Sequence, residues 1–254
     1  MKKHLKILTS LAVFIYAITS LQAAGKEKVL IFAAASAIEA VNELIAEYKK
    51  TSKTEFAASY AGSGTLAKQI VDGGAEANIF ISADTCSMET LEKADKIEKG
   101  TKFLFGKNSL VLVASPKAAA PINKPDDLIQ ALGAGKLAMG DPNYVPAGRY
   151  AADALKYYKI YNILNNNKKL ALYSDVRQAL NSVEMAQADY GIVYKTDTGR
   201  LKKAGIAYTF DAKSHAPIEY PACVIAGKNT PDTKAFIKFM QSRKGKEIIK
   251  QYGF

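Results

Sequence analysis

The residues of this chain that could do chemistry are hydroxyls and helix starts. Ser36 ends the apolar stretch FAAAS and stands three residues before Glu39. This spacing predicts a capping box, in which the serine accepts a helix N–H and the glutamate reaches back. Ser63 lies between two glycines in YAGSGT, ahead of a helix that we expect Thr65 to cap. Tyr194 closes the strand-like stretch YGIVY.

Two further helix starts carry no side-chain donor but expose backbone N–H groups. Ala147 follows Pro146 in DPNYVPAGRY, and Val176 follows the expected N-cap Asp175 in YSDVRQAL. A helix start offers unpaired N–H groups and the positive end of a dipole of about half a charge. If several starts converge, they form an anion site without Lys or Arg. Taken singly, each residue also has an ordinary role as a cap, a turn, a helix start or, for Tyr194, a packed core side chain.

Other kinds of site find little support. Cys86 and His215 lack an evident third partner, and a G-x-S-x-G elbow is missing, which argues against a secreted α/β hydrolase. GSG is neither a Walker motif nor a dinucleotide fingerprint. His4 and His215 cannot build a metal site by themselves. Cys86 and Cys223 have no metal-binding spacing, and they could form a disulfide or stay free.

The elements that must position these residues alternate between strand and helix patterns. Continuous apolar strands between helices predict an α/β fold with buried, mostly parallel sheets. The strands are expected at 29–34, 56–60, 78–82, 109–114, 136–140, 190–194 and 222–227. The helices are expected at 37–50, 64–74, 85–94, 148–161 and 176–187.

The first 23 residues differ from the rest. Lys2, Lys3 and Lys6 precede the apolar run ILTSLAVFIYAITSL and the small residues LQAAG, which predicts a signal peptide cleaved after Ala23 and a periplasmic protein. A retained membrane anchor is the alternative, and lipid attachment lacks a nearby cysteine. The chain of 254 residues has net charge +11, so 11 − 3 leaves +8 after cleavage. Because its lysines are scattered, we expect a solvated basic surface and no nucleic-acid partner.

Eight motifs occur in one order along the whole mature chain: FAAAS, YAGSGTLAKQI, IFISAD, GDPNYVPAGRYA, DVRQAL, ADYGIVY, EYPACVIAG and a terminal YGF. Together they resemble the periplasmic molybdate-binding proteins of bacterial ABC importers. The resemblance implies a two-lobed periplasmic-binding-protein fold (type II) with the ligand in the cleft between lobes. It places the crossings between lobes near 106–108 and 220–221. The first lobe is then 24–106 plus 220–254, and the second is 107–219.

The resemblance also implies a function: binding molybdate or tungstate without reaction, as a monomer that delivers the anion to a membrane permease. It implies no cofactor and no metal ion held directly by side chains, since molybdenum arrives as an oxyanion. The implied ligand residues are Ser36, Ser63, Ala147, Val176 and Tyr194.

This chain departs from the family pattern at three positions. Relatives often have serine in place of Gly62 and Gly64, which affects the expected affinity more than the function, and Asp in place of Asn78. The alternatives are the same fold with sulfate, phosphate or ferric iron, a secreted hydrolase, or a basic nucleic-acid or adhesion protein.

Overall fold

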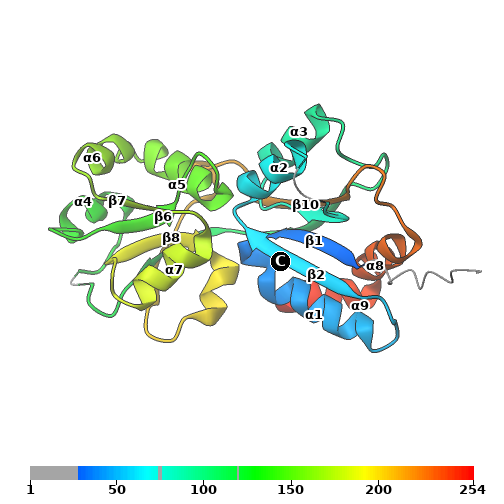
Figure 1. Cartoon of the computed structure of the whole chain (residues 1–254). Helices are drawn as coiled ribbons and strands as arrows, with labels where there is room; N and C mark the ends of the chain where they lie inside the picture. Colours follow the sequence, from blue (N-terminus) through cyan, green and yellow to red (C-terminus); the bar gives the residue numbers. More distant parts are fainter. Residues whose placement is uncertain (1–27, 74–75, 119) are drawn as a thin grey trace, which may run out of the picture.

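The computed structural model describes residues 28–73, 76–118 and 120–254, and it divides into two lobes side by side (Figure 1). The expected signal peptide and its cleavage site lie outside these residues. Each lobe contains one five-stranded sheet with helices on both faces. Among the described helices, none has the length and apolar character needed to cross a membrane.

The first lobe is built on a sheet with strand order β2-β1-β3-β10-β4. Its strands are β1 (Val29–Ala34), β2 (Phe56–Ala61), β3 (Ile79–Ile81), β4 (Phe103–Lys107) and β10 (Glu219–Val224). Its helices are α1 (Ile38–Lys49), α2 (Ser63–Val71), α3 (Thr85–Lys93), α8 (Pro231–Gln241) and α9 (Arg243–Gln251). In Figure 1, α2 and α3 cover one face of the sheet, and α1, α8 and α9 cover the other.

Alternation along β1 explains why this sheet is covered on both faces. Ile31 and Ala33 belong to the large core cluster with the residues of α1, whereas Phe32 packs with Leu66 of α2 and with Phe80. Successive side chains of a strand point to opposite faces, so a strand that is apolar throughout needs helices on both sides.

The second lobe repeats this plan with strand order β7-β6-β8-β5-β9. Its strands are β5 (Leu110–Ala114), β6 (Leu137–Gly140), β7 (Leu170–Tyr173), β8 (Tyr190–Tyr194) and β9 (Gly205–Thr209). Its helices are α4 (Leu128–Ala131), α5 (Pro146–Tyr157), α6 (Tyr161–Asn166) and α7 (Val176–Glu184), and a 3₁₀ segment η3 (Lys195–Arg200) follows β8. Helices α4, α5 and α6 lie on one side of the sheet and α7 on the other (Figure 1).

The α/β class, the two lobes and the mostly parallel sheets are confirmed, because four of the five strands in each sheet run in one direction and only β10 or β5 runs against them. Two of the four strand pairings in each sheet are antiparallel. In the first sheet both involve β10, and in the second sheet both involve β5. The chain forms each of these strands directly after it passes from the other sheet. The chain therefore reaches the new sheet at the end where the parallel strands finish, and the new strand runs in the opposite direction. For example, the first residue of β5, Leu110, pairs with the last residue of β8, Tyr194. The predicted lobe boundaries stay predictions.

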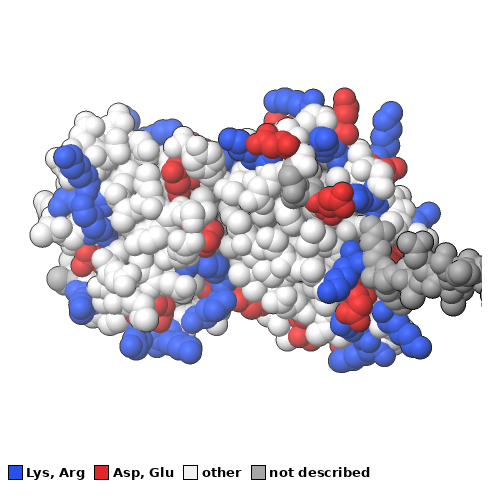
Figure 2. Space-filling model, in the orientation of Figure 1, with Lys and Arg blue, Asp and Glu red and all other residues white. Residues whose placement is uncertain are grey.

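Three strands have no counterpart among the expected elements, and all three are sheet edges: β4, β7 and β9. Most of their residues are half-buried or exposed. An edge strand with one solvated face lacks the continuous apolar run that identified the central strands. On the face drawn in Figure 2, Lys and Arg are scattered over both lobes with Asp and Glu among them.

Candidate functional site

A small pocket lies between the two lobes, where helix starts from both sheets meet. Its cavity volume is about 10 Å³, far below the roughly 300–1,000 Å³ of pockets for drug-sized ligands. All five residues singled out in the sequence line it: Ser36, Ser63, Ala147, Val176 and Tyr194. The structure thus brings together residues that are up to 158 positions apart (194 − 36).

Ser36 does not form the capping box expected for it. A 3₁₀ turn, η1 (Ala35–Ala37), separates β1 from α1, so the N-cap of α1 is Ala37 and no side chain caps the helix. The extra turn frees the Ser36 hydroxyl for a tertiary contact, and its Oγ lies 2.7 Å from the Tyr220 hydroxyl. Glu39 instead forms ion pairs with Arg177 and Arg200 of the other lobe.

Ser63 is the first residue of α2, and Gly62, not the expected Thr65, is the N-cap. Its side chain is fully buried, and Oγ accepts a hydrogen bond from the Ala83 N–H at 3.0 Å. A hydroxyl has one proton and two lone pairs, so this contact leaves the proton of Ser63 free for a ligand. Ser63 can therefore donate into the pocket.

Tyr194 is the last residue of β8, and its phenol is the least satisfied group of the pocket. The side chain is 1% exposed, and its hydroxyl has no hydrogen-bond partner among the described residues. Burial, and next the neighbouring Tyr220, raise the pKa of Tyr194 well above its ordinary value, so the phenol stays protonated. A buried unpaired hydroxyl costs free energy, which a ligand oxygen at this position would recover.

Backbone N–H groups come from the starts of α5 and α7, and the predicted positions of these two helix starts are confirmed. Pro146 opens α5, which makes Ala147 its second residue. Asp175 is the N-cap of α7 and accepts from the N–H groups of Arg177 and Gln178, so its carboxylate does not take the N–H of Val176. The first N–H groups of a helix have no intrahelical acceptor. Ala147 and Val176 therefore add two N–H donors at positive helix ends.

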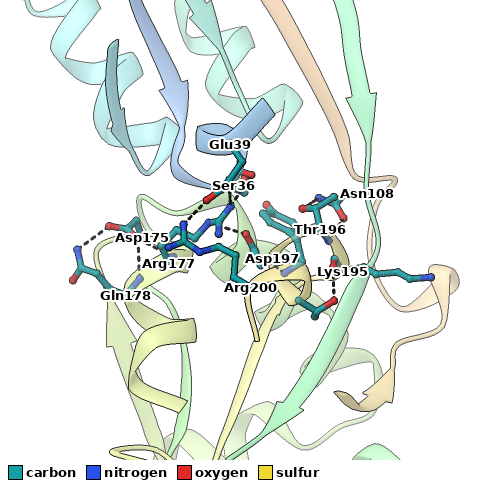
Figure 3. Close-up of polar contacts among 12 residues, drawn as sticks. Ser36, Glu39, Asn108, Asp175, Arg177, Gln178, Lys195, Thr196, Asp197 and Arg200 are labelled. Carbon is teal, nitrogen blue, oxygen red and sulfur yellow. Dashed lines mark hydrogen bonds and ion pairs between the residues drawn. The ribbon is translucent and has the colours of Figure 1, made fainter. Parts of the chain in front are cut away.

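Three arginines of the second lobe lie around the pocket without lining it, and each pairs with a carboxylate of the first lobe. Arg149 donates to Asp84 at 2.8 Å through Nε. Arg177 and Arg200 both reach Glu39 (Figure 3).

Arg177 has two further contacts close to the pocket. One of its terminal nitrogens donates to the Ser36 carbonyl at 3.2 Å. Its Nε lies 3.0 Å from Asp197 Oδ1, a close but poorly aligned ion pair. The positive charges near the pocket are thus already compensated.

These tertiary partners were not identified from the sequence. Arg177 and Glu39 are 138 positions apart, and Arg149 and Asp84 are 65 apart. Local periodicity carries no signal for a contact between lobes.

The remaining reactive side chains do not form a second site. Cys86 and Cys223 are free thiols, the first exposed and the second buried. His215 lies against the ring of Tyr150 and contacts the Ala216 carbonyl. Within the described parts of the chain, no three of the residues His, Cys, Asp and Glu are grouped so that they could hold a metal ion.

The fold and the pocket define a two-lobed binding protein whose donors come from both lobes. The chain belongs to the family of bacterial extracellular solute-binding proteins, whose family model matches residues 29–254. Since members of this family bind solutes, the chain is a binding protein and not an enzyme.

Two curated relatives and one solved structure agree with this placement. The chain is 39% identical over 259 residues to the molybdate-binding protein ModA of Haemophilus influenzae. This alignment covers 100% of this chain and 99% of the relative. It is 38% identical to the molybdate-binding protein ModA of Escherichia coli, with 94% and 93% covered. The periplasmic molybdate-binding protein of Azotobacter vinelandii superimposes with a TM-score of 0.78 at 23% identity, covering 89% of this chain and 98% of that one, and supports the fold alone.

Proposed function

We propose that this protein binds molybdate or tungstate in the pocket between the lobes and delivers it to the permease of an ABC importer. The observation that carries the proposal is the Tyr194 hydroxyl, which is buried and has no hydrogen-bond partner among the described residues, at a pocket that two serines and the starts of α5 and α7 also line. The two ModA relatives are named for binding this anion. The ligand residues are Ser36, Ser63, Ala147, Val176 and Tyr194.

The geometry suits a tetrahedral dianion surrounded by neutral donors. Burying a charge is costly unless hydrogen bonds replace its hydration shell, and charge-assisted bonds to N–H and O–H groups are the strong ones. Asp175 is the only carboxylate among the described residues that line the pocket, and its oxygens already accept from Arg177, Gln178 and the Gln178 side chain. A protonated oxyanion such as hydrogen phosphate needs an acceptor for its own proton, and because most lone pairs of Asp175 are already taken, its binding would be disfavoured. The size of the pocket around the bound ligand would then separate molybdate from the smaller sulfate.

Delivery requires the pocket to open. The Tyr194 hydroxyl is inaccessible in the present arrangement, so the ligand enters when the lobes separate about the two crossings, a hinge motion. We take the lobes as 24–106 plus 220–254 and 107–219. The protein works as a periplasmic monomer after removal of residues 1–23.

Calorimetric titration of the mature protein with molybdate, tungstate, sulfate and phosphate tests the proposal. We expect tight, comparable binding of molybdate and tungstate and at least about hundredfold weaker binding of sulfate and phosphate. Equal affinity for sulfate would replace the proposal with a general oxyanion carrier, and binding of none of the four would reject it. Sequencing the amino terminus of the exported protein checks the cleavage after Ala23.

A further inference from the structure

The hydrogen bond between Ser36 and Tyr220 decides what Ser36 presents to the pocket. The two hydroxyl oxygens are 2.7 Å apart, both side chains are at least 97% buried, and either atom could be the donor. If Ser36 donates to Tyr220, a lone pair of Ser36 faces the ligand. If Tyr220 donates, the Ser36 proton stays free for the ligand. Only the second arrangement suits an anion.

Asn108 sets the direction of this hydrogen bond. Its Oδ1 accepts from the backbone N–H groups of Ser109 at 2.9 Å and Thr196 at 3.4 Å. Because the backbone groups can only donate, the amide cannot be flipped. Its Nδ2 must therefore be the atom that donates to Thr196 Oγ1 at 2.8 Å and to the Tyr220 hydroxyl at 3.2 Å. Figure 3 shows Asn108 and Thr196 side by side.

As a result, the Tyr220 hydroxyl donates its proton to Ser36 Oγ. The Tyr220 side chain has no exposed surface, and within the described residues its hydroxyl forms hydrogen bonds only with Asn108 and Ser36. The amide of Asn108 occupies one lone pair of the phenol, so the phenol proton has Ser36 Oγ as its acceptor. Any other orientation leaves that proton buried without a partner, which is costly. The same ring packs edge-on against Tyr194 at 5.8 Å between centroids.

We propose that Asn108 and Tyr220 are positioning residues of the site, which fix Ser36 as a hydrogen-bond donor toward the ligand. The inference rests on the proposed oxyanion function and extends it to selectivity for fully deprotonated anions. Asn108 follows β4 and Tyr220 belongs to β10, so each residue lies where the chain passes between the sheets. The direction of the Ser36 proton thus depends on both passages being in place.

Reversing the first donor tests this directly. In Asn108→Asp a carboxylate oxygen replaces Nδ2, so Tyr220 should donate to Asp, Ser36 should donate to Tyr220, and a lone pair should face the anion. We expect molybdate affinity to fall at least about tenfold, and the ratio of molybdate to phosphate affinity to fall with it. Tyr220→Phe keeps the ring but removes the relay, by which we mean the hydrogen bonds from Asn108 to Tyr220 and from Tyr220 to Ser36. This variant should lower molybdate affinity about two- to tenfold.

The double variant separates the relay from the added charge. With Phe at position 220, Asn108→Asp still adds a negative charge but no longer has a phenol to reverse, so its effect on affinity should shrink at least about threefold. Asn78→Asp is the matched control. Asn78 is buried where Asn108 is half-buried, but its Oδ1 also accepts a backbone N–H, its Nδ2 also donates to a threonine, and it does not line the pocket. Its molybdate affinity should stay within about twofold of the unmodified protein.

The outcomes distinguish the two proposals. If the unmodified protein binds no oxyanion, the proposed function and this inference fall together. If it binds molybdate, but Asn108→Asp costs the same factor with Tyr or Phe at position 220, the effect is one of charge and the relay is wrong. Unchanged anion selectivity in Asn108→Asp would also overturn it. Melting temperatures of the ligand-free variants show whether each one is folded.

Discussion

Replacing Tyr194 by Phe removes one buried oxygen and should affect stability and binding in opposite directions. The Phe ring keeps the contacts of Tyr194 with Tyr150 and Tyr220. In the ligand-free protein the lost hydroxyl had no partner, so the free energy of unfolding should stay equal or rise, by up to about 1–3 kcal/mol if the pocket remains closed. Binding loses a hydrogen bond to a charged ligand, worth about 1.5–3 kcal/mol, or roughly 13- to 160-fold in affinity.

Thermal melts with and without molybdate measure both effects. At about 100 times its Kd, a ligand adds about 2.7 kcal/mol, which corresponds to roughly 5–11 °C for a chain of this size. If Tyr194→Phe weakens binding about 30-fold, the same concentration is only about 3 times Kd. The ligand then adds about 0.9 kcal/mol, and the shift falls to roughly 2–4 °C. Titration calorimetry gives the affinity independently.

Tyr190→Phe is the matched control because Tyr190 lies on the same strand and is equally buried. Its hydroxyl is satisfied, donating to the Ala120 carbonyl at 2.6 Å, and it does not line the pocket. This variant should lose about 1 kcal/mol of stability and no affinity. The reasoning is refuted if Tyr194→Phe lowers the ligand-free melting temperature while its affinity holds, because Tyr194 would then be an ordinary core residue.

Three further predictions follow from contacts around the pocket. A Cβ on Gly64 would lie 2.6 Å from the Tyr144 carbonyl of the other lobe. Gly64→Ala should therefore weaken molybdate binding about tenfold or more, without lowering the stability of the ligand-free protein. If calorimetry gives an unchanged affinity, the lobes do not approach this closely in the bound protein. Arg149→Ala leaves the buried Asp84 carboxylate without its guanidinium, and titration should show weaker binding although Arg149 does not line the pocket. Burial raises the pKa of Asp197 to about 6, although the neighbouring Arg177 acts in the opposite direction. The folded protein therefore favours the protonated side chain, and this contribution to the free energy of unfolding is complete below about pH 4 and lost as pH rises to about 6. Melting curves of Asp197→Asn should lack this loss, and parallel pH profiles for the two proteins would contradict it.

How far the sequence predicted the site depends on the range of the interaction. The starts of α5 and α7 were identified because proline at the first helical position and aspartate at the N-cap act within a single turn. The assignment of Ser36 to a capping box was wrong because one 3₁₀ turn shifts the start of α1, and nothing in a three-residue spacing reveals such a turn. The edge strands β4, β7 and β9 were missed because burial on one side leaves no continuous apolar run.

The positioning residues were beyond local reasoning for a different reason. Tyr220 and Asn108 were known only as positions near the expected crossings, and their hydrogen bonds reach 184 and 112 positions along the chain. The resemblance to a family identified the five pocket residues by motif. It could not show which hydroxyl donates, because that depends on an amide whose orientation is set by two backbone N–H groups.

The arginines around the pocket explain how a neutral site can sit among charges. Arg177 and Arg200 face Glu39 and Asp197, and Arg149 faces Asp84, so each group of positive charges meets an equal number of carboxylates. Because these arginines are compensated, discrimination between anions rests on hydrogen-bond direction and fit, and affinity should depend only weakly on salt. The ion pairs of Glu39 and Asp84 join the two lobes, so in the proposed hinge motion they would form as the pocket closes. Charge therefore stabilises the closed arrangement, while neutral donors inside it recognise the ligand.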